Sequence, residues 1–329
     1  MLETPSSPPH FRPFMHPQRL TFTVPPELGG KRLDQALALL CPEHSRARLQ
    51  SWIRGGHVTV DDRVPRQRDP VRAGERIVLH CVVEPGPGGD IGQDIPLNVI
   101  YEDRALIVIN KPPGLVVHPG AGNPDRTLMN ALLHHAPELE GVPRAGIVQR
   151  LDKDTSGIMV IARTLPAHTW LVRHLKERKV RREYRAIVCG TFTAGGRIEA
   201  PIGRHRVDRK RMAVMPGGRP AVTHYRVLQR FRAHAYLQVI LETGRTHQIR
   251  VHLAHIRHPV VGDPAYGGRR PAPKGLSETL REALRAFPRQ ALHASDLSLA
   301  HPDSGKEMSW SAPLPDDMQS LLKLLADEC

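Results

Sequence analysis

The first part of the chain alternates apolar and polar residues in a way that predicts a small unit of helices and strands. Residues 19–24 place apolar side chains at every second position, as a half-buried strand does. Residues 33–40 place them at the spacing of one helix face, and Ser45 is a suitable N-cap for a second helix. A hairpin at 58–60 and a closing segment at 74–79 would complete the unit.

The rest of the chain mixes strand-like and helix-like segments. The expected strands and short apolar runs are residues 97–101, 105–110, 146–148, 158–162, 184–188, 223–228 and 236–242. The expected helices are residues 127–134, 164–179, 246–255 and a last amphipathic helix around Leu321. Because strands and helices do not alternate one by one, the pattern predicts an α+β fold with a largely antiparallel sheet.

A break in composition separates these two parts. Residues 84–90 read Glu-Pro-Gly-Pro-Gly-Gly-Asp and hold no side chain able to pack, which is typical of a flexible linker. A chain of 329 residues is also long enough for two hydrophobic cores. We therefore expect a disordered Pro-rich tail at 1–18, a first domain at 19–83, a linker at 84–95 and a second domain at 96–329.

The composition of the chain indicates the cellular compartment in which we expect the protein. No apolar run approaches the ~20 residues that a membrane helix needs, and the N-terminal segment lacks the apolar core of a secretory signal. The 4 cysteines have no C-x-x-C spacing, which favours neither a disulfide framework nor a zinc ribbon. We expect a cytosolic protein with no membrane partner, and nothing in the sequence requires more than a monomer.

Positive charge is concentrated in one stretch. The net charge is +14, and residues 163–232 alone hold 18 Lys and Arg against 4 Asp and Glu, so the remainder is neutral. Such a focused basic surface is expected where a protein contacts nucleic-acid phosphates. Aromatic residues are only 4%, which favours structured RNA or a duplex over a stacked single strand. The candidate RNA-binding residues are Lys31, Arg32, Arg46, Arg48 and Arg54 in the first domain and Arg204, Arg206, Arg209, Lys210 and Arg211 in the basic stretch.

The polar loop at residues 150–157, Arg-Leu-Asp-Lys-Asp-Thr-Ser-Gly, lies between two apolar runs and is a candidate catalytic segment. Asp152-x-Asp154 followed by Thr155 nearly matches the aspartyl-phosphate phosphatases, which use magnesium. In that pattern, however, the Thr stands one position later, and the preceding strand has no charged residue such as Arg150. An ordinary turn capped by its own Asp, Ser and Thr side chains is a further interpretation.

Several further motifs, which follow one another in a fixed order along the chain, help to choose between these interpretations of the loop. The loop resembles the catalytic motif of the RluA-type pseudouridine synthases, whose usual His before Arg-Leu-Asp is here Gln149. Residues 108–120, 182–185 and 241–267 resemble the opening segment, the tyrosine motif and the third motif of that family. The first domain, with Gly-Lys-Arg-Leu-Asp at 30–34, resembles an S4 RNA-binding domain. The likeness runs from the first expected strand to near the C-terminus.

The resemblance implies a fold and a reaction. The fold would be an S4 domain followed by a catalytic domain on a mostly antiparallel mixed sheet with flanking helices. The enzyme would be an isomerase that converts uridine to pseudouridine in a stem-loop of 23S ribosomal RNA or a large-subunit assembly intermediate. It would need neither a cofactor nor a metal, and the target base would have to flip out of its stack.

The resemblance also implies roles for individual residues. Asp152 would be the catalytic carboxylate, Tyr184 would stack on the flipped base, and Arg150 would prop the gap left in the RNA. An arginine beside Asp152 would favour its ionised form, and Arg250 is the first candidate, with Arg245 second. Taken without the motif, Tyr184 is better explained as a core residue, and Arg245 and Arg250 could be phosphate contacts.

Two other interpretations have to be weighed. His247, His252, His255 and His258 suggest a metal site, but on one helix their spacing would fan the rings apart. A non-catalytic RNA-binding assembly factor on the same scaffold would share the charge and the domains. Only the need for Asp152 separates that factor from an enzyme.

Overall fold

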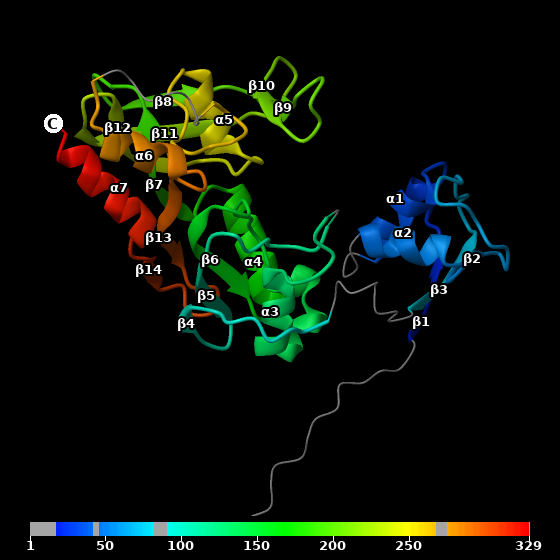
Figure 1. Ribbon diagram of the computed structural model, residues 1–329. Helices are drawn as coiled ribbons and strands as arrows, with labels where there is room; N and C mark the ends of the chain where they lie inside the picture. Colours follow the sequence, from blue (N-terminus) through cyan, green and yellow to red (C-terminus); the bar gives the residue numbers. More distant parts are fainter. Residues whose placement is uncertain (1–17, 42–45, 82–90, 121, 268–274, 329) are drawn as a thin grey trace, which may run out of the picture. The chain divides into compact units, whose positions relative to one another are not determined.

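The computed structural model describes residues 18–41, 46–81, 91–120, 122–267 and 275–328 (Figure 1). The chain divides into two compact units, Met1–Gly86 and Pro87–Cys329. The expected tail, apart from Gln18, and residues 84–90 of the expected linker lie outside the described residues. Ile91, also expected in the linker, accepts a hydrogen bond from Asn130 of the second unit through its carbonyl (2.8 Å). The domain bounds themselves stay a prediction.

The first unit packs two helices on a small antiparallel sheet. Its elements are β1 (Gln18–Thr23), a 3-10 turn (Pro26–Leu28), α1 (Leu33–Leu40), α2 (Arg46–Arg54), β2 (Val58–Val60) and β3 (Arg76–Cys81). The strand order is β1-β3-β2. Leu37 of α1 and Leu49 of α2 are buried with Ile77 and Leu79 of β3 in one core. The helical spacing read from residues 33–40 therefore places the apolar face against the sheet.

The second unit is built on one mixed sheet of nine strands. Its strands are β4 (Val99–Glu102), β5 (Leu106–Lys111), β6 (Ser156–Ala162), β7 (Arg181–Cys189), β8 (Gly196–Glu199), β11 (Val222–Arg230), β12 (His234–Leu241), β13 (Leu292–Ala300) and β14 (Glu307–Ser311). The order is β4-β5-β6-β13-β7-β12-β11-β8, with β14 paired to β13. Every pair is antiparallel except β6 with β13, which is parallel.

Helices and two cores flank this sheet. The helices are α3 (Leu128–His135), α4 (Leu165–Lys176), α5 (Gln248–His255), α6 (Glu278–Ala286) and α7 (Asp316–Ala326), with 3-10 turns at Pro137–Gly141 and Pro143–Gly146. Alternate residues of β5 face opposite sides of the sheet. Ile107 and Ile109 join the core that includes α3, α5, α6 and α7, whereas Leu106 and Val108 join a second core with α4. The α+β fold on a mostly antiparallel sheet is as predicted.

A separate two-stranded hairpin carries the centre of the basic stretch. Its strands are β9 (Ile202–Arg204) and β10 (Met212–Val214), and it extends away from the main sheet (Figure 1). Neither this hairpin nor β8, β13, β14 and α6 was predicted from the pattern. Residues 146–148 form no strand, because the chain turns there through Arg144 and Ala145 at positive φ (58° and 49°). In the described part of the chain, no helix is long and apolar enough to cross a membrane.

Candidate active site

A pocket of about 610 Å³ opens in the second unit, lined by the loop that precedes β6, by β7 and by the segment from β12 into α5. Its cations far outnumber its two acids, Asp152 and Glu242. They are Arg144, Arg150, Lys176, Arg178, Arg182, Arg219, Arg245 and Arg250. A concave site with this balance of charge favours an anionic ligand.

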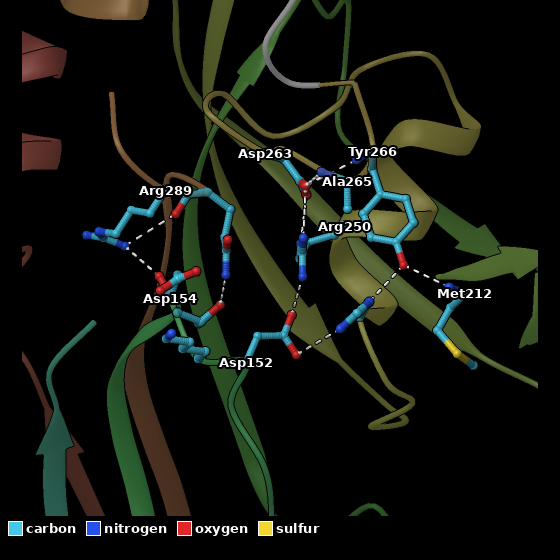
Figure 2. Close-up of polar contacts among 12 residues, drawn as sticks. Asp152, Asp154, Met212, Arg250, Asp263, Ala265, Tyr266 and Arg289 are labelled. Atoms are coloured by element: carbon cyan, nitrogen blue, oxygen red, sulfur yellow. Dashed lines mark hydrogen bonds and ion pairs between the residues drawn. The ribbon is translucent and has the colours of Figure 1, made fainter. Parts of the chain in front are cut away.

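Asp152 lies in this pocket with its side chain 19% exposed. Its Oδ2 accepts a hydrogen bond from Nη1 of Arg250 at 2.9 Å (Figure 2). Its Oδ1 lies 3.8 Å from Nε2 of His247, which is too far for a hydrogen bond. One carboxylate oxygen is therefore fixed by a cation, and the other remains available to a ligand.

Arg250 is itself held rigidly by a second carboxylate. Its Nε and Nη2 donate to the two oxygens of Asp263 at 2.7 and 2.8 Å, a bidentate geometry. Asp263 is fully buried and also accepts the backbone N–H groups of Ala265 and Tyr266. Burial opposes the charge on Arg250, but Asp263 and Asp152 together raise its pKa above the usual value. The guanidinium thus stays charged and cannot swing away from Asp152.

His247 extends this network toward the basic hairpin. It is the residue before α5, in the left-handed conformation (φ 55°), and its Nδ1 lies 2.7 Å from the hydroxyl of Tyr266. That hydroxyl accepts the backbone N–H of Met212 on β10 at 2.9 Å (Figure 2). Burial lowers the pKa of His247, so the ring is neutral at neutral pH. The Tyr266 hydroxyl can donate its proton to Nδ1, and in that arrangement the ring proton lies on Nε2, the atom that faces Asp152.

The loop that carries Asp152 is fastened through its main chain. Lys111 is fully buried, and its ammonium donates to the carbonyls of Pro112, Leu115 and Lys153 at 2.7, 2.9 and 2.9 Å. The backbone N–H of Gly114 donates to the same Lys153 carbonyl at 2.9 Å. Burial lowers the pKa of Lys111 to about 7. The opening segment of the second unit therefore holds the loop of Asp152 from one side.

Residues near the C-terminal end hold the loop from the other side. Arg289 is bidentate to Asp317 (2.7 and 2.8 Å). Its Nη1 also donates to the carbonyl of Asp154 at 3.2 Å (Figure 2). The loop ends at Gly157, whose φ of +116° is open only to glycine, and a Cβ there would lie 2.1 Å from the carbonyl oxygen of Ala294. The motif glycine is therefore needed for the loop to enter β6 beside β13.

The other residues implied by the resemblance also line the pocket. Tyr184 on β7 is 7% exposed, and burial raises the pKa of its hydroxyl, so it stays protonated. Arg150 is exposed at the rim. Arg245 donates from Nε to the carbonyl of Pro220 at 3.1 Å, so Arg250 is the arginine that pairs with Asp152. Burial and neighbouring arginines lower the pKa of Arg245.

The pocket also contains residues to which the sequence assigned no role. Gln149 lines it where the family usually has His. His118 lines it too, and its Nε2 is buried with no hydrogen-bond partner among the described residues. Burial, aided by Arg144 and Arg150, lowers the pKa of His118 to about 4. Arg182 stands two residues before Tyr184 on one strand, and this spacing could have placed it in the pocket, because such residues share a face.

The candidate RNA-binding residues fall into two groups. In the first unit, Lys31 and Arg54 are exposed, whereas Arg32 forms an ion pair with buried Asp34 at 3.0 Å. Arg46 and Arg48 lie on α2, but their side chains are outside the described residues. In the hairpin, the exposed residues are Arg204, Arg206, Arg209 and Lys210. Arg211 is half-buried, with its guanidinium carbon 5.3 Å from the ring centre of Tyr266.

The histidines of the third motif are not gathered around a common point. His252 is fully buried and bonds Thr223 Oγ1 (2.9 Å) and the carbonyl of Ala200 (3.0 Å), whereas His247 meets Tyr266. In the described ranges, no group of three or more His, Cys, Asp or Glu side chains is arranged to hold a metal ion.

Comparison with known proteins gives matches over both units. The family model described as RNA pseudouridylate synthase matches residues 105–255, and the S4 domain model matches residues 31–77. A relative from Pseudomonas aeruginosa, named ribosomal large subunit pseudouridine synthase D, is 58% identical over 305 residues, which are 93% of this chain and 95% of the relative. The protein of that name from Escherichia coli K12 is 54% identical over 308 residues, covering 93% and 94%.

Solved structures resemble a large part of the chain. Human RNA pseudouridylate synthase domain containing 4 matches with a TM-score of 0.55 and 28% identity, covering 70% of this chain and 93% of that one. Human RNA pseudouridylate synthase domain containing 1 matches with a TM-score of 0.51 and 25% identity, covering 71% and 96%.

Proposed function

The chain belongs to the family of RNA pseudouridine synthases, which are isomerases, and from this premise we propose that it converts specific uridines of 23S ribosomal RNA to pseudouridine. The proposal of a ribosomal substrate is supported by relatives named for the large ribosomal subunit, which match nearly the whole chain. The observation that carries the catalytic part is the Asp152–Arg250 pair in a basic pocket.

The reaction rearranges one nucleotide without adding or removing an atom. The bond between N1 of uracil and C1′ of the ribose breaks, the base turns, and C5 forms a new bond to C1′. The proton on C5 is then lost, and N1 gains one. No electrons are exchanged with a second substrate, so the balance requires no oxidant, reductant or group donor.

In the proposed mechanism, Asp152 acts on the flipped nucleotide as an ionised carboxylate. Addition to the base and removal of a sugar proton both require that form, which the charge of Arg250 favours. The oxygen of Asp152 that Arg250 does not hold is the one available to the substrate. Tyr184 supplies an apolar ring face for the base and a neutral hydroxyl for proton transfer. The pocket is of a size that holds a small ligand, so a duplex must release the base before it can react.

The remaining charges bind the RNA outside the pocket. We assign backbone contacts to the cations of the hairpin, which are exposed and contribute affinity with little sequence information. Arg150 lies at the rim, where it can fill the space that the flipped base leaves. The S4 domain, with Lys31, Arg32 and Arg54 on its first two helices or next to them, adds a second contact. Recognition then depends on the shape of the RNA.

The test compares ribosomal RNA from a strain without this gene with RNA from the same strain carrying it on a plasmid. Carbodiimide mapping should show pseudouridines that disappear on deletion and return with the wild-type gene. Asp152→Asn should restore none of them, while Asp154→Asn, a carboxylate two residues away in the same loop, should restore them. Modification that survives in Asp152→Asn would overturn the mechanism. An unchanged 23S map would exclude this substrate, and tRNA mapped in the same strains would show whether any RNA is modified.

A further inference from the structure

Arg182 is a buried cation that has no partner among the described residues. Its side chain is 8% exposed and lines the pocket beside Tyr184. Its Nε is buried without a hydrogen-bond acceptor. Within the described ranges the guanidinium forms no hydrogen bond or ion pair at all. This distinguishes it from Arg250, which is equally buried and saturated by two carboxylates.

Burying part of a charged group without a partner is costly, because the buried atom, here Nε, loses its hydration and receives no hydrogen bond in return. Both acids of the pocket are already engaged. Asp152 pairs with Arg250, and Glu242 accepts from Arg178 and from His224. The acid next to Arg182 in sequence, Glu183, pairs with Arg181 at 2.6 Å. None of these acids neutralises Arg182, and a ligand that enters the pocket is the group that can do so.

We propose that Arg182 binds a phosphate that flanks the target uridine. This inference rests on the proposed function, because it takes the flipped nucleotide as the ligand of the pocket. The two terminal nitrogens would donate to two phosphate oxygens in the fork geometry that arginine forms with such groups. The same phosphate would anchor the nucleotide while its base rotates next to Asp152.

The position of Arg182 favours a phosphate over the base. Arg182 and Tyr184 lie on one face of β7, two residues apart, so their backbones are separated by about 7 Å. A base stacked on Tyr184 is joined to its own phosphate through one ribose, and the distance from base to phosphate is similar to the distance between these two backbones. Uracil is neutral before and after the reaction, whereas the phosphate is always charged. Only the phosphate therefore supplies a permanent counter-charge.

The loop over Arg182 leaves room for this contact. Gly244 passes the guanidinium so closely that a Cβ at that position would lie 2.9 Å from Nη1 of Arg182. Because the loop carries no side chain here, the terminal nitrogens reach the pocket. Gly244→Ala should push the guanidinium away from its place and weaken RNA binding in the same direction as the loss of Arg182.

The first experiment separates binding from chemistry and from folding. Arg182→Gln should weaken binding of a synthetic stem-loop, carrying a uridine mapped in the deletion strain, by about 10- to 100-fold. The single-turnover rate at saturating RNA should change by less than about threefold, since the phosphate is charged in ground and transition states alike. Arg181→Gln, on the opposite face of β7 and 59% exposed, is the matched control and should bind within about threefold of wild type.

The melting temperature of the protein without RNA distinguishes a ligand-binding role of Arg182 from a structural one, because the two roles predict opposite changes. If the partner of Arg182 is a ligand, Arg182→Gln removes an unpaired buried charge from the free protein, and the melting temperature without RNA should stay equal or rise. If Arg182 instead stabilises the fold, the melting temperature should fall. A fall would overturn the proposal even if RNA binding were also weakened.

The decisive experiment removes the charge from the RNA instead. Two stem-loops are made, each with a neutral methylphosphonate at one of the two linkages that flank the target uridine. Each methylphosphonate stands beside a 2′-deoxy sugar. The control for each is a stem-loop with the same deoxy sugar and an ordinary phosphate. At one linkage, the neutral group should weaken binding to wild type by about 10-fold or more and leave binding to Arg182→Gln unchanged. Equal losses for both proteins at both linkages would overturn the inference. The proposed function would fail separately, if wild type formed no pseudouridine in the unmodified stem-loop.

Discussion

Replacing Lys111 with Met should remove a dependence of stability on pH that the wild-type protein has. The ammonium of Lys111 is fully buried and donates to three carbonyls, one of them in the catalytic loop. Burial lowers its pKa from 10.5 to about 7. Met keeps the length of the side chain and cannot titrate, so the variant isolates the effect of the proton.

The sign follows from which state holds more protons. Between pH 7 and 10.5 the unfolded chain keeps the Lys111 proton and the folded chain has released it. The free energy of unfolding of the wild type therefore rises with pH in this window and is lowest below pH 7, where the folded state must bury the charge. The slope reaches about 1.4 kcal/mol per pH unit. From pH 7 to pH 9, the wild type should gain about 2 kcal/mol over Lys111→Met.

Urea unfolding followed by tryptophan fluorescence measures this gain. The chain has 3 tryptophans, of which Trp52 is in the first unit and Trp170 and Trp310 are in the second. A Trp52→Phe background confines the signal to the unit that contains Lys111. Lys153→Met, which removes an exposed lysine from the same loop, should follow the wild type at every pH. A constant difference between wild type and Lys111→Met from pH 7 to 9 would refute the reasoning.

Two further substitutions test the supports of the site. Arg250→Met should lower the free energy of unfolding by about 3–5 kcal/mol, because it leaves the carboxylate of Asp263 buried without its counter-charge; urea titration at neutral pH checks this. Gly157→Ala should cost about 3 kcal/mol or more, since its Cβ would overlap the Ala294 carbonyl in addition to the strain of φ +116°. Gly305→Ala, at φ +67° with open space around it, should lose only about 1–2 kcal/mol, and urea titration of both glycine variants checks the difference.

Local patterns predicted those parts of the fold whose burial follows from the residues themselves. The apolar run of β5, the alternation in β12 and the helical spacing in α1 and α4 are visible in the sequence, because their apolar residues meet the core directly. β13 was not predicted, because polar residues occupy buried positions in it. His293 bonds Ser156 at 2.9 Å, and Ser295 donates to the Glu183 carbonyl at 3.4 Å. These partners come from β6 and β7, far away in the sequence, so no local window contains them.

The candidate site, like the fold, was only partly predictable from the sequence. The motifs identified Asp152 and Tyr184, and the choice between Arg245 and Arg250 needed the position of α5 relative to the loop. The positions of the charged residues along the sequence also do not show which of their side chains are buried. Arg182 was counted with the basic stretch as one cation among 18, although it is the buried one that lacks a partner. The roles assigned to these residues stay predictions until the variants are measured.

The catalytic loop is fastened at its two middle positions by carbonyl oxygens, those of Lys153 and Asp154. Every amino acid provides such an oxygen, so these anchors place no demand on which side chain stands there. The side chains at the two positions can therefore be exchanged without loosening the carboxylate next to them. Evolution, or an engineer, can use these two positions, which do not line the pocket, to change the surface of the loop while the pairing of Asp152 with Arg250 is kept.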